Sequence, residues 1–245
     1  EYKVALPPGE HMDFEPGSYA QIKIPAFSID YDKDFDKSLI GDTYLPAWKN
    51  FGLFNLKCTN DTPTVRAYSM ANYPDEGDII TLNVRIATPP FKPKEQGGGF
   101  MDVNPGIASS YIFSLKPGDK VLMSGPYGEF RPQYDSDREM IWVGGGAGMA
   151  PLRAQIMHML KTLNVRTREM HYFYGARALE EVPFLNDFLE LEKEYSNFHF
   201  HLALDRPDPK ADAAGIAYTP GFVAPVMGDT YLKQHETPED CEYYL

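Results

Sequence analysis

Cysteine is scarce in this chain, and its scarcity excludes whole classes of protein. The 245 residues contain two cysteines, Cys58 and Cys241. Two cysteines cannot build a framework of several disulfides, nor can they supply the four thiolates of an iron–sulfur cluster held within this chain. Long apolar runs are also missing. No stretch approaches the ~20 residues that span a bilayer, and no signal-peptide pattern opens the sequence.

Positive charge is in short supply as well. The chain has 23 lysines and arginines against 35 aspartates and glutamates, which gives a formal net charge of −12. This balance argues against nucleic acid as a partner. The remaining composition, 43% hydrophobic and 24% charged, is that of a globular protein with room for one large or two ordinary domains. Because both ends read as interrupted strands, we expect the sequence to be part of a longer protein.

The pattern of the chain changes near residue 135. Before it, residues 19–24 and 80–86 alternate between apolar and polar side chains, and residues 120–124 read as another strand. After it, apolar strands at 139–143, 169–174, 198–203 and 242–245 alternate with helical patterns at 151–163, 182–194 and 221–234. We therefore predict an antiparallel β-barrel at 1–134, with an acidic, aromatic insertion at 26–63. A doubly wound parallel α/β domain follows at 135–245.

A glycine-rich turn opens the first helix of the second half. The run Val143-Gly144-Gly145-Gly146-Ala147-Gly148-Met149-Ala150-Pro151 follows an apolar strand and leads into a helical pattern. Such a turn lets the backbone approach a ligand, and the helix start offers free N–H groups to a phosphate. The glycine spacing differs from that of the common dinucleotide-binding pattern, G-x-G-x-x-G. Glycine turns after an apolar strand also occur in α/β domains that bind no nucleotide.

Two shorter motifs lie in the first half. In Arg66-Ala67-Tyr68-Ser69, the arginine could pair with a phosphate, the tyrosine could pack on a flat ring, and the serine could reach a ring nitrogen. The alternative is a surface arginine beside a structural tyrosine. In Gly106-Ile107-Ala108-Ser109-Ser110, two serines stand at a predicted helix start, where they could bind phosphate or simply cap the helix.

The order of these motifs along the chain resembles the ferredoxin–NADP reductase superfamily, in which a flavin-binding β-barrel precedes a nicotinamide-binding α/β domain. Longer stretches resemble one branch of it more closely, the F-subunit family of bacterial sodium-translocating NADH:quinone oxidoreductases. These stretches are residues 66–74, 82–90, 109–112 and 238–244, together with the insertion at 26–63. The resemblance implies FAD and NADH as cofactors, with hydride passing from NADH to FAD and electrons leaving singly to a 2Fe–2S centre.

The resemblance also assigns roles to residues. Tyr68 would pack on the flavin ring and Ser69 would stand near its reactive nitrogen, which makes these two the expected catalytic residues. The residues implied to hold FAD are Arg66, Ala67, Tyr68, Ser69, Asn83, Val84, Arg85, Ile86, Ala108, Ser109 and Ser110. Those implied to hold NADH are Gly146, Ala147, Gly148, Met149, Tyr174, Gly175, Ala176 and Arg177. Since one arginine there is followed by Glu180 and Glu181, NADH is favoured over NADPH.

The same resemblance supplies a context outside the sequence. The implied partners are a 2Fe–2S ferredoxin-like domain of the same polypeptide and the other subunits of a membrane complex, at the cytoplasmic face of the bacterial inner membrane, with this fragment itself soluble. A membrane helix upstream and a final segment bearing a cysteine beside the nicotinamide are expected beyond the given sequence.

Two alternative functions remain open at this stage, and a metal site is also considered. The chain could be the reductase component of a multicomponent oxygenase, or a flavin- or nucleotide-binding regulatory module without catalysis. A metal site would be a third possibility, since His199 and His201 alternate on a predicted strand. No further ligand lies near them in sequence, so we expect no metal site. The run from Asp30 to Asp36 is interpreted as a solvated loop.

Overall fold

The computed structural model describes the backbone of residues 1–245 and every side chain except that of Gln96. The chain forms two compact units that interleave along the sequence. Unit 1 comprises residues 1–4, 20–68 and 84–125, and unit 2 comprises residues 5–19, 69–83 and 126–245. The domain boundary at residue 134 stays a prediction, and the two units are described separately below.

Unit 1 is built on short β-sheets. Its main sheet has the strand order β5-β2-β7, and a second pair, β3 and β4, is antiparallel with Phe27 opposite Asn60. Along β2, Ala20, Ile22 and Ile24 are fully buried, as the alternating sequence predicts. Unit 1 contains all or most of six strands. They are β1 (Tyr2–Ala5), β2 (Tyr19–Ile24), β3 (Phe27–Asp30), β4 (Lys57–Asn60), β5 (Thr64–Ser69) and β7 (Leu122–Tyr127).

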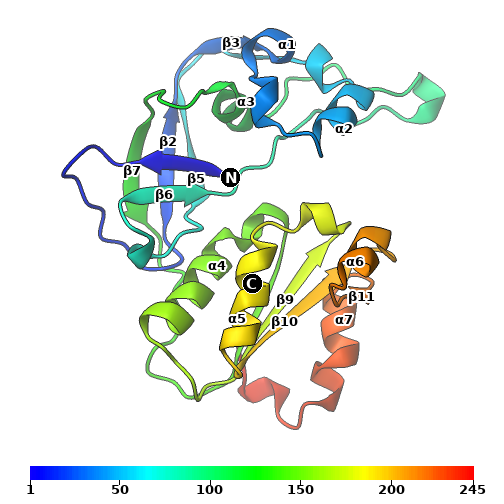
Figure 1. Ribbon diagram of the computed structural model, residues 1–245. Helices are drawn as coiled ribbons and strands as arrows, with labels where there is room; N and C mark the ends of the chain where they lie inside the picture. The colour runs from blue at the N-terminus through cyan, green and yellow to red at the C-terminus, as the bar shows by residue number, and fades with distance from the viewer. The chain divides into compact units, whose positions relative to one another are not determined.

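The insertion at 26–63 folds into ordered structure around its own small core. Besides β3 and β4 it contains α1 (Tyr31–Asp34), α2 (Leu45–Asn50) and two 3₁₀ turns, Lys37–Leu39 and Leu53–Asn55. Its buried residues pack against α3 (Ile107–Ser114), and Figure 1 shows α1, α2 and α3 close together. That core consists of Ile29, Tyr31, Phe35 and Cys58, with Trp48, Ile107 and Phe113 against it.

Unit 2 contains the parallel sheet that the sequence predicts. Its strand order is β11-β10-β9-β8-β12, and the in-register pairs run from Phe198 through Met170 and Met140 to Glu242. Because β9 and β12 flank β8 on opposite sides, the direction of chain progression reverses at β8. The strands are β6 (Ile79–Leu82), β8 (Met140–Gly145), β9 (Met170–Ala176), β10 (Phe198–Leu204), β11 (Thr219–Pro220) and β12 (Glu242–Tyr244).

Helices cover both faces of this sheet (Figure 1). Trp142 and Tyr172 share one apolar core with residues of α4 and α5, whereas Ile141 and Phe173 share another with residues of α7. Neighbouring strand residues thus point to opposite faces, as the pleat requires. The helices are α4 (Ala150–Met157), α5 (Leu185–Glu194), α6 (Pro209–Ala214) and α7 (Val223–Thr230). Among the described residues, no helix has the length and apolar character needed to cross a membrane.

Several predicted boundaries were wrong for local reasons. The strand predicted at 80–86 ends at Leu82, because the bridge from Leu82 to Met70 is the last pairing on this segment. The helix predicted at 151–163 changes to a π-helical turn at His158–Thr162. The helix predicted from residue 182 begins at Leu185, since Phe184 before it adopts a left-handed φ of 55°. Helix α6 was not predicted.

Candidate functional site

The glycine turn lies where β8 ends and α4 begins, at the carboxyl edge of the parallel sheet. Gly146 has a φ of +58°, which favours glycine, and a Cβ on Gly145 would come within 3.0 Å of the Gly175 carbonyl oxygen. A Cβ on Gly148, by contrast, would meet nothing within 4 Å. Gly145, Gly146 and Gly148 are all exposed. The first two glycines therefore shape the turn, while the third leaves open space against its backbone.

Buried side chains support this turn from beneath. The Met149 side chain is 0% exposed and belongs to the core shared with α4 and α5. Tyr174 is 1% exposed, and its hydroxyl donates to the carbonyl oxygens of Gly146 at 3.3 Å and Glu181 at 3.4 Å. Both residues were assigned to NADH binding from the sequence. The structure brings them to the turn, but with their side chains turned into the protein.

A second recess lies beyond the end of β9. It is a cavity of about 250 Å³ lined by Arg177 at the end of the Tyr174-Gly175-Ala176-Arg177 motif and by the segment after β10. The Arg177 guanidinium pairs with Glu181 at 3.0 and 2.5 Å, so Glu181 raises the pKa of Arg177. Lys210 pairs with Glu180. Two cations at this recess thus each have a carboxylate partner.

The residues after β10 were not predicted to belong to this site. The sequence pattern indicates one arginine, Arg177, at the adenosine end of the predicted NADH site, whereas Arg206 and Lys210 line the same cavity. Asp208 caps α6, because its carboxylate accepts the N–H groups of Leu179, Lys210 and Ala211. These three hydrogen bonds lower the pKa of Asp208. The signal was available in the run Asp205-Arg206-Pro207-Asp208-Pro209, since Asp followed by Pro is a helix start.

The Arg66–Ser69 motif occupies the end of β5 in unit 1, with Ser69 counted in unit 2. Arg66 and Ala67 are exposed, and Tyr68 and Ser69 are half-buried. The Arg66 guanidinium rests on its own strand, donating to the Thr64 hydroxyl at 3.0 Å and the Val65 carbonyl at 2.8 Å. Burial raises the pKa of Tyr68, which keeps its hydroxyl neutral. The strand therefore presents one cation and one aromatic ring to solvent or a ligand.

The hydroxyls of the two serines at the start of α3 form hydrogen bonds within the protein. Ser109 accepts the Ala87 N–H at 3.0 Å and donates to the Gly106 carbonyl at 3.1 Å. Ser110 is 0% exposed, donates to the same carbonyl at 2.7 Å, and lies 2.7 Å from the Tyr31 hydroxyl. Ala108 is 9% exposed. The hydroxyls thus brace the helix start, and the N–H groups of its first turn remain as donors for an anion.

Residues 83–86, which the resemblance implies contact FAD, do not belong to a strand. Asn83, Val84, Arg85 and Ile86 follow β6 outside any helix or strand, with Arg85 exposed and the other three half-buried. Without a neighbouring strand, the backbone of this segment has no ladder partners to satisfy its N–H and C=O groups.

Comparison with known proteins accounts for this set of features. Residues 51–132 match the family model of the oxidoreductase FAD-binding domain, and residues 142–244 match that of the oxidoreductase NAD-binding domain. The F subunit of the Na(+)-translocating NADH-quinone reductase of Colwellia psychrerythraea is 46% identical over 243 residues, which are 99% of this chain and 75% of that protein. The chain belongs to this F-subunit family. The F subunit of the Serratia proteamaculans reductase is 49% identical over 245 residues, and this chain spans 56% of its length.

Solved structures share the fold of this F-subunit family member. A cytochrome P450 reductase from Amycolatopsis superposes with a TM-score of 0.60 at 22% identity, covering 99% of this chain and 64% of that one. A ferredoxin NADP+ reductase from Neisseria gonorrhoeae, solved with bound FAD and NADP, has a TM-score of 0.59 at 15% identity over 98% of this chain and 76% of that one. Two-domain architecture of the ferredoxin–NADP reductase kind is therefore established for the chain.

The residues present fit the two cofactors that the family models imply. For the nicotinamide nucleotide, the turn offers exposed backbone at Gly146 and Gly148, where a Cβ would meet no protein atom within 4 Å. For the flavin, the exposed Arg66 cation and the first-turn N–H groups of α3 are donors suited to a pyrophosphate. When bound, the nicotinamide supplies a hydride donor and the flavin a hydride acceptor.

Proposed function

We propose that this chain is the FAD- and NADH-binding part of an NADH dehydrogenase. The observation that carries the proposal is the place of the glycine turn, at the carboxyl end of β8 where the strand order reverses. In doubly wound sheets this switch point is where nucleotides bind. Gly146, Ala147, Gly148 and Met149 would hold the NADH pyrophosphate through their backbone, with Tyr174 fixing the turn from below.

The flavin site would be formed by the Arg66–Ser69 motif and the start of α3. Arg66 and the N–H groups at the start of α3 would bind the FAD pyrophosphate, while Tyr68 would pack on the ring system and Ser69 would donate a hydrogen bond near the reacting nitrogen. The Ser109 and Ser110 hydroxyls are internally bonded, so they support this site by holding α3 in place. The protein's contribution is orientation of the two ring systems, because the hydride chemistry belongs to the cofactors.

The wider role follows from the relatives' names and remains part of the proposal. Electrons would leave singly to a 2Fe–2S centre in a ferredoxin-like domain of the same polypeptide. The whole protein would act within a sodium-translocating NADH:quinone oxidoreductase at the cytoplasmic face of the bacterial inner membrane. NADH would be the preferred donor, because Glu180 and Glu181 already pair with Lys210 and Arg177 and leave these two cations less available to an added phosphate.

The test mixes the FAD-loaded full-length protein with NADH under anaerobic conditions in a stopped-flow spectrometer. We expect the flavin absorbance to bleach with a rate that saturates with NADH concentration. Binding of both cofactors without bleaching would overturn the dehydrogenase proposal in favour of a regulatory module.

A matched pair of alanine substitutions tests whether the NADH pyrophosphate binds at the glycine turn. Gly148→Ala introduces a Cβ that meets no protein atom within 4 Å, so the fold should tolerate it. If the pyrophosphate approaches this backbone, NADH should bind about tenfold more weakly, a loss of about 1.4 kcal/mol. Gly228→Ala on α7 is the control, because it too meets nothing within 4 Å. Equal NADH affinity in the two variants would exclude the turn as the pyrophosphate site.

A further inference from the structure

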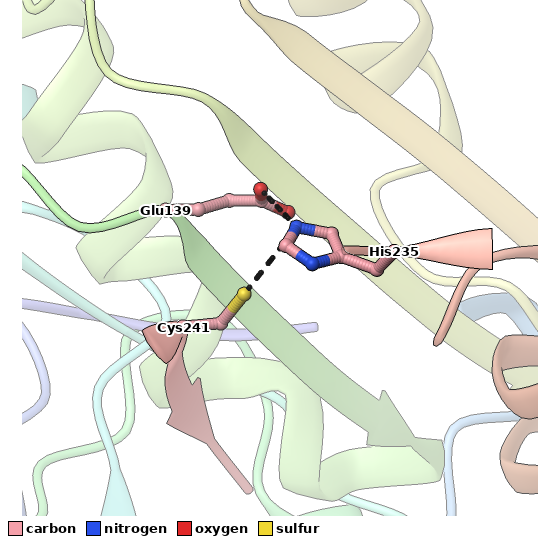
Figure 2. Close-up of side chains that lie close together, drawn as sticks. All are labelled: Glu139, His235 and Cys241. Carbon is pink, nitrogen blue, oxygen red and sulfur yellow. Dashed lines mark hydrogen bonds and ion pairs between the residues drawn. The ribbon is translucent and has the colours of Figure 1, made fainter. Parts of the chain in front are cut away.

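Three metal-binding side chains converge at the amino edge of the parallel sheet, opposite the glycine turn. Glu139 precedes β8 and Cys241 precedes β12, and the pairing of Glu242 with Met140 sets these two residues side by side. His235 enters from the loop that follows the helical turn Leu232–Gln234. Figure 2 shows the Glu139 carboxylate, the His235 imidazole and the Cys241 thiol pointing toward one another. None of the three has a place in the cofactor sites described above.

The spacing of the donor atoms matches that of ligands around one small cation. His235 Nε2 lies 3.0 Å from Glu139 Oε2 and 3.7 Å from Cys241 Sγ, and the three donor atoms all lie within 4.8 Å of one another. Zn–S bonds of about 2.3 Å and Zn–N or Zn–O bonds of about 2.0 Å at a tetrahedral angle place ligand atoms about 3.3–3.6 Å apart. The two distances from His235 Nε2 are thus within a few tenths of an ångström of this spacing, and the third separation lies within the 4.8 Å bound.

The chemical character of the donors selects the metal. One thiol, one imidazole and one carboxylate form a mixed S, N, O set, which suits Zn²⁺ and does not suit the all-oxygen preference of Ca²⁺ or Mg²⁺. On binding, the thiol loses its proton to solvent, and Zn²⁺ with one thiolate and one carboxylate has no net charge. The Glu139 and His235 side chains are 17% and 19% exposed. Burying net charge costs free energy, so a site without net charge suits this half-buried position.

Neighbouring groups already orient the carboxylate. The Tyr231 hydroxyl donates to Glu139 Oε1, and His171 Nε2 lies 3.5 Å from the same oxygen. Oxygen Oε2 is the one that faces His235. Hydrogen bonds of this kind around the ligands are typical of metal sites, because they fix the direction of each lone pair.

One contact must open when a metal binds. His235 Nδ1 accepts the Thr237 N–H at 3.1 Å, and a metal on Nε2 would move the ring proton to Nδ1. Thr237 is exposed, so its N–H can exchange this bond for one to water while its carbonyl keeps the Asp240 N–H at 3.0 Å. Release of this amide is therefore a local signature that distinguishes coordination by His235 from zinc adsorbed elsewhere.

We propose that Glu139, His235 and Cys241 bind one Zn²⁺ ion. The ion fastens the three-residue strand β12 and the segment after α7 to the amino end of β8. Solvent completes its coordination at the fourth position.

The test uses the full-length, FAD-loaded protein, stripped with a chelator and titrated with ZnCl₂. Zinc X-ray absorption is selective for this element, so flavin and iron do not interfere. We expect one tightly bound zinc with a single sulfur neighbour at about 2.3 Å, a higher thermal midpoint, and faster hydrogen exchange of the Thr237 amide. A zinc environment without sulfur would overturn the proposal.

Matched variants locate the site. Cys241→Ser should remove the sulfur signal and weaken zinc binding at least tenfold, and His235→Gln should weaken it similarly. Cys58→Ser replaces the other buried cysteine and should change neither. Loss of zinc binding in His199→Gln would instead assign the ion to Glu169, His171 and His199, and would refute the proposal. Equal thermal midpoints in chelator verify that the variants fold alike, and unchanged zinc binding in folded Cys241→Ser also refutes it.

Discussion

Arg153 on α4 is the most heavily engaged charge in unit 2, and its replacement by methionine is the sharpest test of the packing described above. Its side chain is 6% exposed. The guanidinium donates to the Ala71 carbonyl at 2.8 Å, to both oxygens of Glu76 at 3.0 and 2.8 Å, and to Asp187 at 2.8 Å. It therefore joins α4 to α5 and to the segment that follows Ser69.

The expected cost follows from what the partners can do afterwards. Removing one member of a buried ion pair costs about 3–5 kcal/mol when the other charge stays buried. Glu76 and Asp187 are each 31% exposed, so water would partly restore their solvation and lower this part to about 2 kcal/mol. The Ala71 carbonyl loses a charge-assisted hydrogen bond worth about 1 kcal/mol. We expect Arg153→Met to lower the free energy of unfolding by about 3 kcal/mol.

Urea unfolding followed by tryptophan fluorescence measures this loss. The chain has two tryptophans, and Trp142 is fully buried in the core of the α/β sheet. A Trp48→Phe background leaves Trp142 as the reporter of that sheet. Adding Glu76→Gln and Asp187→Asn to Arg153→Met should recover at least about 1 kcal/mol by removing the unpaired carboxylates. Exposed Lys193→Met is the control. A loss below about 1 kcal/mol for Arg153→Met would refute the reasoning.

Three further outcomes are expected. Gly144→Ala would bring a Cβ within 2.7 Å of Leu152 Cδ1, so it should cost about 1–3 kcal/mol in urea unfolding, and an unchanged midpoint would contradict the packing. Burial lowers the pKa of His201 to about 4 from an ordinary 6.5, so the unfolded chain binds the extra proton between these values. His201 should then contribute a loss of stability of at most about 1.4 kcal/mol per pH unit as the pH drops below 6.5. Burial lowers the pKa of His171 to about 3 and adds a loss in the same direction, so His201→Gln should reduce the slope without abolishing it; an equal slope in the variant would assign it to other groups. Glu180→Ser with Glu181→Arg should raise the ratio of NADPH to NADH use in steady-state assays, and an unchanged ratio would contradict the assigned specificity.

The parallel sheet could be predicted because its signals are local. The cores of β8 and β9 are short apolar runs, and the glycine turn and following proline mark the start of α4. The exposed two-residue strand β11 has no such signal and was not predicted. The ends of helices and strands were predicted wrongly where a tertiary contact or a single backbone conformation sets them. The 80–86 alternation continues past Leu82, but strand pairing stops there because no partner follows. The start of α5 depends on the left-handed Phe184, which periodicity does not encode.

Side-chain roles were harder to predict than elements. Ser109 and Ser110 have the sequence of a phosphate-binding helix start, yet their hydroxyls bond to Gly106, and this choice depends on rotamers. The donor set at the amino edge of the sheet was missed for a different reason. No short stretch of sequence contains it, since residue 139 is brought close to residues 235 and 241 by the parallel pairing of β8 with β12. A search for ligands near His199 and His201 in sequence could not find them.

The two edges of the sheet separate the proposed metal from the proposed nucleotide. Strand β8 runs from one edge to the other and has six residues, from Met140 to Gly145. At about 3.3 Å per residue, it spans about 20 Å. That distance exceeds twice the Debye length of about 8 Å at physiological salt, and the zinc site with its two anionic ligands is neutral. Zinc should therefore raise the thermal midpoint while leaving the KM for NADH unchanged. A shift in KM of about fivefold or more would mean that β8 moves as a unit and couples the two edges mechanically, because electrostatics over this distance cannot supply such a shift.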